Sequence, residues 1–175
     1  MSPSLIVFLI GALGLAIVWR RHLAAPGSHG FYRFFAFTAL LGLAAWNAPS
    51  WFVEPLSPIQ MISWILLAGS LAVALIAGRT LRRFGRPVGG IERTTALVTS
   101  GIYGRVRHPL YGSLLLLAAG AWLKDVSWAS SGLALFAAVA IVATAVAEER
   151  ELEAQFGEAY AAYRGWTKRF LPGVW

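Results

Sequence analysis

The sequence contains no cysteine, and among its 175 residues it has only three histidines and eight acidic residues. The absence of cysteine excludes disulfides, thiolate metal sites and a cysteine nucleophile. Because the three histidines are scattered along the chain, a metal centre is not expected either. Charged residues make up 13% of the chain, whereas soluble globular domains usually have about 25%. These scarcities argue against a soluble domain and against thiol or metal chemistry.

The sequence is correspondingly rich in apolar and aromatic residues. The hydrophobic fraction is 58%, and the eight tryptophans fit a protein whose rings lie at water–lipid boundaries. The net charge of +7 could suggest nucleic acid, but the basic residues lie beside apolar stretches. In that position they are better explained as juxtamembrane topology signals. We therefore expect an integral membrane protein surrounded by membrane lipids, with no nucleic-acid partner.

Five apolar stretches predict an all-α fold with five transmembrane helices in a single domain. They are residues 4–19, 31–48, 58–78, 109–123 and 127–147. A straight crossing takes about 20 residues, so the 109–123 stretch is short. The first three stretches form a membrane portion, residues 1–78. The remainder, residues 79–175, carries most of the polar residues and is the expected catalytic portion, followed at its end by a cytosolic amphipathic helix.

The distribution of basic residues predicts the orientation. If all five stretches cross, every lysine and arginine except Lys124 falls on one side. The positive-inside rule then places the N-terminus outside and the C-terminus in the cytoplasm. A bacterial inner membrane is the location expected for so small a chain without organelle signals. Two polar segments, 79–108 and 148–175, share the cytoplasmic side.

The turn between the last two stretches brings these polar segments together. It has only about three residues, so residues 109–147 must form an antiparallel helical hairpin. We therefore expect His108, before the hairpin, to lie at the same membrane face as Glu148 and Glu149, after it. This prediction joins two polar clusters that lie 40 residues apart in the sequence.

The motif RVRHP (105–109) predicts a helix start at the first polar cluster. Proline suits the first helical turn, so Pro109 would begin the helix and His108 would cap it. Such a helix terminus carries partial positive charge and is suited to an anionic group. A topology-setting arginine pair with an interfacial histidine explains the motif equally well.

The second cluster begins with a carboxylate pair at a predicted membrane exit. Glu148 and Glu149 need a partner there, either Arg105 or Arg107 or a cationic ligand. The segment that follows predicts one continuous helical face, formed by Glu149, Leu152, Phe156, Tyr160 and Tyr163. An amphipathic helix packed on the membrane is the alternative reading. The basic and aromatic tail, 163–175, would anchor to anionic headgroups or close over a site.

These motifs resemble a known family in two parts. SGIYGRVRHPLYGS (100–113) and EERELEAQFGEAYAAYRGWTKRFLP (148–172) together resemble the isoprenylcysteine carboxyl methyltransferases, and phospholipid N-methyltransferases share the pattern. The resemblance covers residues 79–172, whereas residues 1–78 match only as generic membrane spans. The matching residues are Gly101, Tyr103, Arg107, His108, Pro109, Tyr111, Glu148, Glu149, Leu152, Phe156, Gly157, Tyr160, Tyr163, Arg169 and Pro172.

The resemblance implies an all-helical membrane methyltransferase that uses S-adenosylmethionine in a cytosol-facing pocket. A lipophilic substrate would enter from the bilayer, and the acceptor would be an isoprenylcysteine-like carboxylate or another lipophilic small molecule. The implied cofactor-binding residues are Tyr103, Arg107, His108, Pro109, Tyr111, Glu149 and Tyr160. The implied catalytic or substrate-facing residues are Glu148, Arg164 and Arg169.

Three alternatives remain open on the sequence. A phospholipid amine N-methyltransferase would need a base, which Glu148, Glu149 or His108 could supply. An NADPH-dependent sterol-type reductase would need arginines for a phosphate, and residues 79–107 contain seven. A non-catalytic membrane scaffold would use the cations and aromatic rings only as anchors, but it would gain nothing from the paired glutamates.

Overall fold

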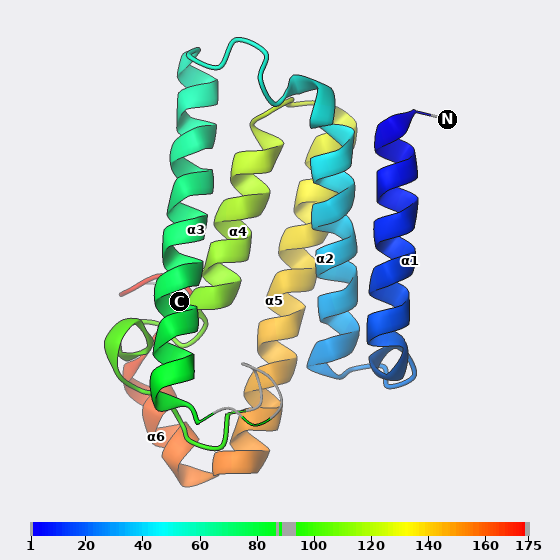
Figure 1. Cartoon of the computed structure of the whole chain (residues 1–175). Helices are drawn as coiled ribbons and strands as arrows, with labels where there is room; N and C mark the ends of the chain where they lie inside the picture. Colours follow the sequence, from blue (N-terminus) through cyan, green and yellow to red (C-terminus); the bar gives the residue numbers. More distant parts are fainter. Residues whose placement is uncertain (1, 87, 89–93, 174–175) are drawn as a thin grey trace.

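The computed structural model describes residues 2–86, 88 and 94–173. Within this part of the chain the regular structure is helical, and turns and loops join the helices (Figure 1). An isolated parallel bridge pairs Val106 with Lys168. The helices are α1 (Pro3–Leu23), α2 (His29–Trp46), η1 (Ala48–Ser50), α3 (Pro58–Phe84), η2 (Gly101–Gly104), α4 (Pro109–Trp122), α5 (Trp128–Phe156) and α6 (Glu158–Trp166). Within the predicted polar segments, residues 87, 89–93 and 174–175 lie outside the described residues.

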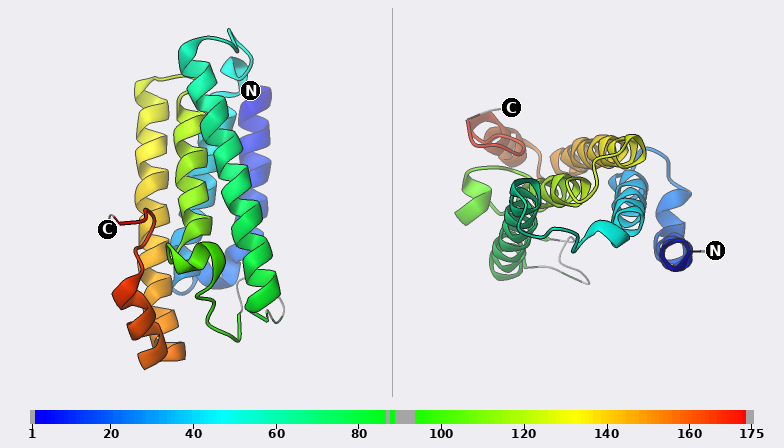
Figure 2. Two further views of the ribbon diagram at one scale, coloured as in Figure 1. Left: turned by 90° about the vertical axis from the view of Figure 1, so that its left-hand side faces the viewer. Right: turned by 90° about the horizontal axis from the view of Figure 1, so that it is seen from above.

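Five long helices stand side by side and alternate in direction (Figures 1 and 2). The packing order is α1 on α2, α2 on α5, α5 on α4 and α4 on α3. Because α1, α3 and α5 run towards the same end, that end gathers the chain after α3, the start of α4 and all of α6 (Figure 1). The predicted hairpin is confirmed, since α4 and α5 are antiparallel neighbours joined by a short turn.

The helix starts follow from capping residues in the sequence. The Ser28 hydroxyl accepts from the backbone N–H of Phe31, and Ser127 with Ser130 forms a capping box at the start of α5. Pro109 is the first residue of α4 and His108 is its cap, as predicted. The His108 side chain makes no capping hydrogen bond, which leaves its ring for another partner.

Small side chains let the helices approach closely, as is usual in membranes. Between α2 and α5 the core is built largely of alanines. Between α3 and α4, the Ser63 hydroxyl donates to the Gly120 carbonyl over 2.7 Å, and Ser70 donates to the Ser113 carbonyl over 2.7 Å. A methyl group added at Gly120 would lie 2.9 Å from Leu67 Cγ. These contacts fix the position of α4 along α3.

Three helices of the described chain are long and apolar enough to cross a membrane, namely α1, α3 and α5. α4 is apolar but has 14 residues, fewer than the about 20 that a straight crossing takes. α2 has 18 residues and includes the charged Arg33. The structure therefore supports a membrane protein with an all-helical fold, and the crossing of all five helices stays a prediction.

The predicted continuous helix after residue 147 is wrong. α5 continues to Phe156 and ends at Gly157, whose φ of 55° and ψ of −129° lie outside the helical region. α6 begins at the next residue and turns back along the bundle (Figures 1 and 2). Glycine lacks the Cβ that makes a positive φ costly, so the chain reverses there. The predicted helical face therefore exists on each side of Gly157, but it is not continuous across the turn.

We expect Gly157→Ala to destabilise the protein by about 1 to 3 kcal/mol, because alanine is strained at this backbone conformation. No described atom lies within 4 Å of the added methyl group, so the loss would come from the backbone alone. Thermal unfolding in detergent measures it. Gly165→Ala is the matched control, since Gly165 is helical and also faces open space. Equal stability of the two variants would contradict this account of the turn.

Candidate active site

Hydrogen bonds join the C-terminal tail to the loop that precedes α4. The backbone N–H of Arg107 donates to the Lys168 carbonyl over 2.8 Å, and that of His108 donates to the Arg169 carbonyl over 3.0 Å. The Tyr163 hydroxyl donates to the Tyr103 carbonyl over 2.7 Å. The return of α6 after Gly157 makes these bonds possible. The loop, α5 and the tail therefore form one unit at this end of the bundle.

A buried carboxylate lies at the centre of this unit. One oxygen of Glu149 accepts from Arg107 Nε over 3.0 Å and from Arg169 Nε over 3.1 Å, and it lies 3.2 Å from His108 Nε2. The other oxygen accepts from Arg169 Nη2 over 2.8 Å. The Glu149 residue is only 5% exposed. The predicted meeting of His108 with the carboxylate pair is therefore confirmed for Glu149.

The contacts of Glu149 are those of a cross-link. Its partners come from the loop before α4 and from the tail, so a single carboxylate joins three segments. Arg107 extends the network, because its Nη1 donates to the carbonyls of Arg164 and Thr167. Buried charges are tolerated when they are paired and hydrogen-bonded in this way.

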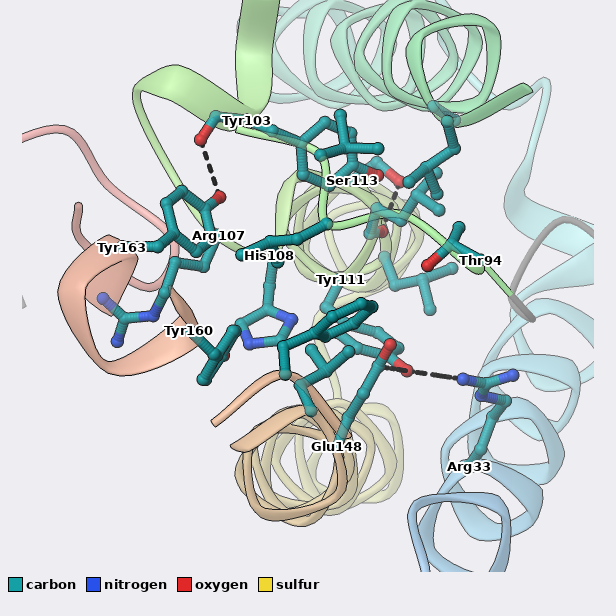
Figure 3. Close-up of a pocket in the computed structure, with 18 of the residues that line it drawn as sticks. Arg33, Thr94, Tyr103, Arg107, His108, Tyr111, Ser113, Glu148, Tyr160 and Tyr163 are labelled. Atoms are coloured by element: carbon teal, nitrogen blue, oxygen red, sulfur yellow. Dashed lines mark hydrogen bonds and ion pairs between the residues drawn. The ribbon is translucent and has the colours of Figure 1, made fainter. Parts of the chain in front are cut away.

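A cavity of about 250 Å³ opens beside this cross-link, and Arg107 and His108 belong to both. Figure 3 shows residues that line the cavity. Its walls come from α2, α3, the segment 94–108, α4, α5 and α6, so most of the bundle contributes. Apolar side chains line much of it, and a few polar groups converge on the space (Figure 3). A concave, largely apolar pocket with few polar groups is typical of small-molecule sites.

Glu148 is the carboxylate that lines this cavity. It accepts a hydrogen bond from the Tyr111 hydroxyl, and Nη2 of Arg33 lies 3.9 Å from one of its oxygens. Its side chain is 24% exposed, in contrast to the 7% of Glu149. Figure 3 shows Glu148 and Arg33 reaching toward each other from different helices. The two neighbouring glutamates thus occupy different environments.

Tyr160 brings a hydroxyl without a protein partner to the same cavity. Its side chain is fully buried, and within the described part of the chain its oxygen has no hydrogen-bond partner. Burial raises the pKa of Tyr160 well above its ordinary value, and the charge of Glu149 adds to this effect. Burial also raises the pKa values of Tyr103 and Tyr163. These phenols therefore remain neutral at ordinary pH, and the buried Tyr160 hydroxyl is a donor without a partner among the described residues.

The structure divides the predicted site residues into two groups. Those that line the cavity are Tyr103, Arg107, His108, Tyr111, Glu148 and Tyr160. Those outside its lining are Pro109, Glu149, Arg164 and Arg169. Pro109 is fully buried at the start of α4, and Arg164 is exposed and forms an ion pair with Glu153.

Three polar residues of the cavity wall, Arg33, Thr94 and Ser113, were not predicted from the sequence. Arg33 was counted among the topology-setting charges. A signal was nevertheless present, because Arg33 lies inside an apolar stretch, and a charge at such a place usually has a partner or a function. Leu152, Phe156, Tyr160 and Tyr163, which the sequence placed on one helical face, all line the cavity from both sides of the Gly157 turn.

The arrangement suits a ligand with a positive charge and hydrogen-bonding groups. Glu148 offers an anion, Tyr160 offers a hydroxyl, and the rings of Tyr103, Tyr111 and Phe156 offer surfaces that attract cations. No group of three or more potential metal ligands occurs among the described residues. Arg33 and Arg107 also line the cavity, so its polar groups suit an organic ligand that carries charges of both signs.

Comparison with known proteins identifies one family. The model of the phospholipid methyltransferase family matches residues 59–159, more than half of the chain. The matched segment contains α3 except its first residue, all of α4 and α5, and the start of α6. No curated protein matches the chain significantly. No solved structure matches it significantly either.

We expect Glu149→Gln to lower the free energy of unfolding by about 3 to 5 kcal/mol, because it leaves two half-buried arginines without their counter-ion. The control is Glu153→Gln, which removes an exposed carboxylate paired with Arg164, and such a pair contributes about 0 to 1 kcal/mol. Thermal unfolding of both variants in the same detergent gives the comparison. If Glu149→Gln were as stable as the control, the carboxylate would not be the cross-link described.

Proposed function

Because the chain belongs to the phospholipid methyltransferase family, we propose that this membrane methyltransferase binds S-adenosylmethionine in the cavity beside Glu148. We further propose that it methylates a lipophilic acceptor, the class best supported being an amine-bearing lipid. The observation that carries the proposal is the Glu148 carboxylate, aimed into an aromatic cavity built largely by the segment that matches the family.

The chain's own residues fit this cofactor. Its ammonium and sulfonium groups are cations, which the Glu148 carboxylate and the aromatic rings attract. Its hydroxyl groups suit the unpaired Tyr160 hydroxyl. When bound, S-adenosylmethionine supplies an already activated methyl group. The protein then has to align the acceptor and keep water away, which the buried, mostly apolar walls support.

The roles assigned to Glu149 and Arg169 change within this proposal. Both side chains are occupied by each other, and Arg107 also binds Glu149. We therefore propose that they fix the wall of the cavity and leave the ligand to Glu148. Arg164 lies outside the cavity wall and is exposed, so we assign it no contact with the cofactor.

Glu148 is the feature of the cavity that favours an amine acceptor over a carboxylate, whereas Arg33 and Arg107 bring positive charge to the same wall. Glu148 attracts a protonated amine, whereas it repels a carboxylate. An amine must also lose a proton before it attacks the methyl group, and a carboxylate at the reacting centre can accept that proton. The description of the family supports the same acceptor class and favours methyl transfer over the reductase and scaffold alternatives.

The proposal includes the orientation in the membrane. We propose that α1 to α5 all cross and that the end bearing the cavity faces the cytoplasm. In its support, the antiparallel bundle places Arg20, Arg21 and Arg82 near the cavity end and Lys124 at the other. Such an asymmetry is what the positive-inside rule associates with the cytoplasmic side.

We expect the purified protein to bind S-adenosylhomocysteine saturably in isothermal titration, and Glu148→Gln to weaken binding about tenfold. A tenfold change corresponds to about 1.4 kcal/mol, a modest value for a lost charge-assisted hydrogen bond. Glu153→Gln serves as the control, since it removes the same charge outside the cavity and should leave the Kd unchanged. Absence of binding by the unaltered protein would reject the proposed cofactor.

We expect incubation with methyl-labelled S-adenosylmethionine and a total lipid extract to give a labelled lipid that keeps its label in alkali. A methylated amine is stable there, whereas a methyl ester releases labelled methanol. Mass spectrometry then identifies the amine. Release of the label as methanol would show a carboxylate acceptor and contradict the proposed class.

A further inference from the structure

Arg33 is a buried cation that the family match does not cover. It belongs to α2, whereas the matched segment begins at residue 59. It is 5% exposed, and its Nη2 donates to the Tyr111 hydroxyl over 2.6 Å. Its Cζ lies 5.8 Å from the centre of the Tyr111 ring. A charged side chain inside a membrane bundle is costly, and it usually has a partner and a function.

A second contact fixes α2 at this level of the bundle. The backbone N–H of His29 donates to one oxygen of Glu151 over 3.0 Å, and its ring Nδ1 lies 2.5 Å from the other oxygen. Glu148 and Glu151 are three residues apart on α5 and so share a face of that helix. The beginning of α2 therefore contacts two carboxylates of α5. The contact of His29 with Glu151 fixes the position of Arg33 along the bundle axis, next to the cavity.

The hydrogen bond from Arg33 determines which way the hydroxyl proton of Tyr111 points. A guanidinium group has only donors, so Arg33 occupies the acceptor side of the Tyr111 oxygen. The single hydroxyl proton then points to Glu148, to which it is hydrogen-bonded. Without Arg33 the hydroxyl could rotate, and the Glu148 carboxylate would lose a fixed donor and a nearby counter-ion 3.9 Å away.

We infer that Arg33 is a positioning residue of the cofactor site, acting through Tyr111 to hold the Glu148 carboxylate in the cavity. This inference rests on the proposed function, because it assigns Glu148 to the cofactor. It gives the first two helices a part in the site: α2 carries the arginine, and α1 packs on α2. The family-matched segment alone would then lack one side of the cavity.

The test compares the Kd of S-adenosylhomocysteine for the full-length protein and four variants in detergent. The variants are Arg33→Gln, Tyr111→Phe, the double variant and Arg21→Gln. Arg21 is an exposed arginine at the same end of the bundle, so its variant controls for the loss of one positive charge. Melting temperatures without ligand are recorded for each, because a purely structural arginine would change stability and leave the Kd of the folded protein unchanged.

We expect Arg33→Gln and Tyr111→Phe each to raise the Kd about fivefold to tenfold, with the double variant within twofold of the weaker-binding single variant. Such non-additivity shows that the two residues act as one unit. Arg21→Gln should bind as the unaltered protein does. If Arg33→Gln does not fold, Arg33→Lys takes its place, because lysine keeps the charge but lacks the planar guanidinium group; its Kd should rise at least threefold.

Two results would overturn the inference while leaving the proposed cofactor intact. One is an unchanged Kd in the arginine variant, with or without a lower melting temperature. The other is multiplication of the two single effects in the double variant, which would make Arg33 independent of Tyr111. Failure of the unaltered protein to bind S-adenosylhomocysteine would instead overturn the proposed function, and the inference would fall with it.

Discussion

The carboxylate of Glu149 joins the three segments whose meeting creates the cavity. Arg107 and His108 approach it from the loop before α4, and Arg169 approaches it from the tail. The carboxylate itself belongs to α5. Since these partners belong to the loop and the tail and not to the long helices, the bundle can form without this contact, but the cavity wall cannot. The hydrogen bonds between the backbones of residues 107–108 and 168–169 depend on the same approach.

The adjacent Glu148 has a different role because of helix geometry. Successive residues on a helix point about 100° apart, so one glutamate faces the loop and the tail while its neighbour faces the cavity. The arginines next to Glu149 are used within the protein, and Glu148 is left to Tyr111, Arg33 and a ligand. In the proposed function, one carboxylate therefore maintains the shape of the site, and the other supplies its negative charge.

The hairpin could be predicted because its turn is short, and the meeting of His108 with Glu149 followed from it. The start of α4 could be predicted because Pro109 suits a first helical turn. The break at Gly157 was missed, because in the sequence the helical spacing continues from Phe156 to Tyr160 without a change of register. The different environments of Glu148 and Glu149 were beyond the sequence, because they depend on where the tail returns. Arg33 was missed because an arginine near a membrane end ordinarily marks topology.

A crystal structure of the protein with S-adenosylhomocysteine, grown from a lipid mesophase, tests the division between the two glutamates most directly. The account predicts the ligand in the cavity, in contact with Glu148 and the Tyr160 hydroxyl, while Glu149 remains bound to Arg107 and Arg169. A structure in which Glu149 leaves its arginines to hold the ligand, or in which the ligand lies away from Glu148, would contradict it.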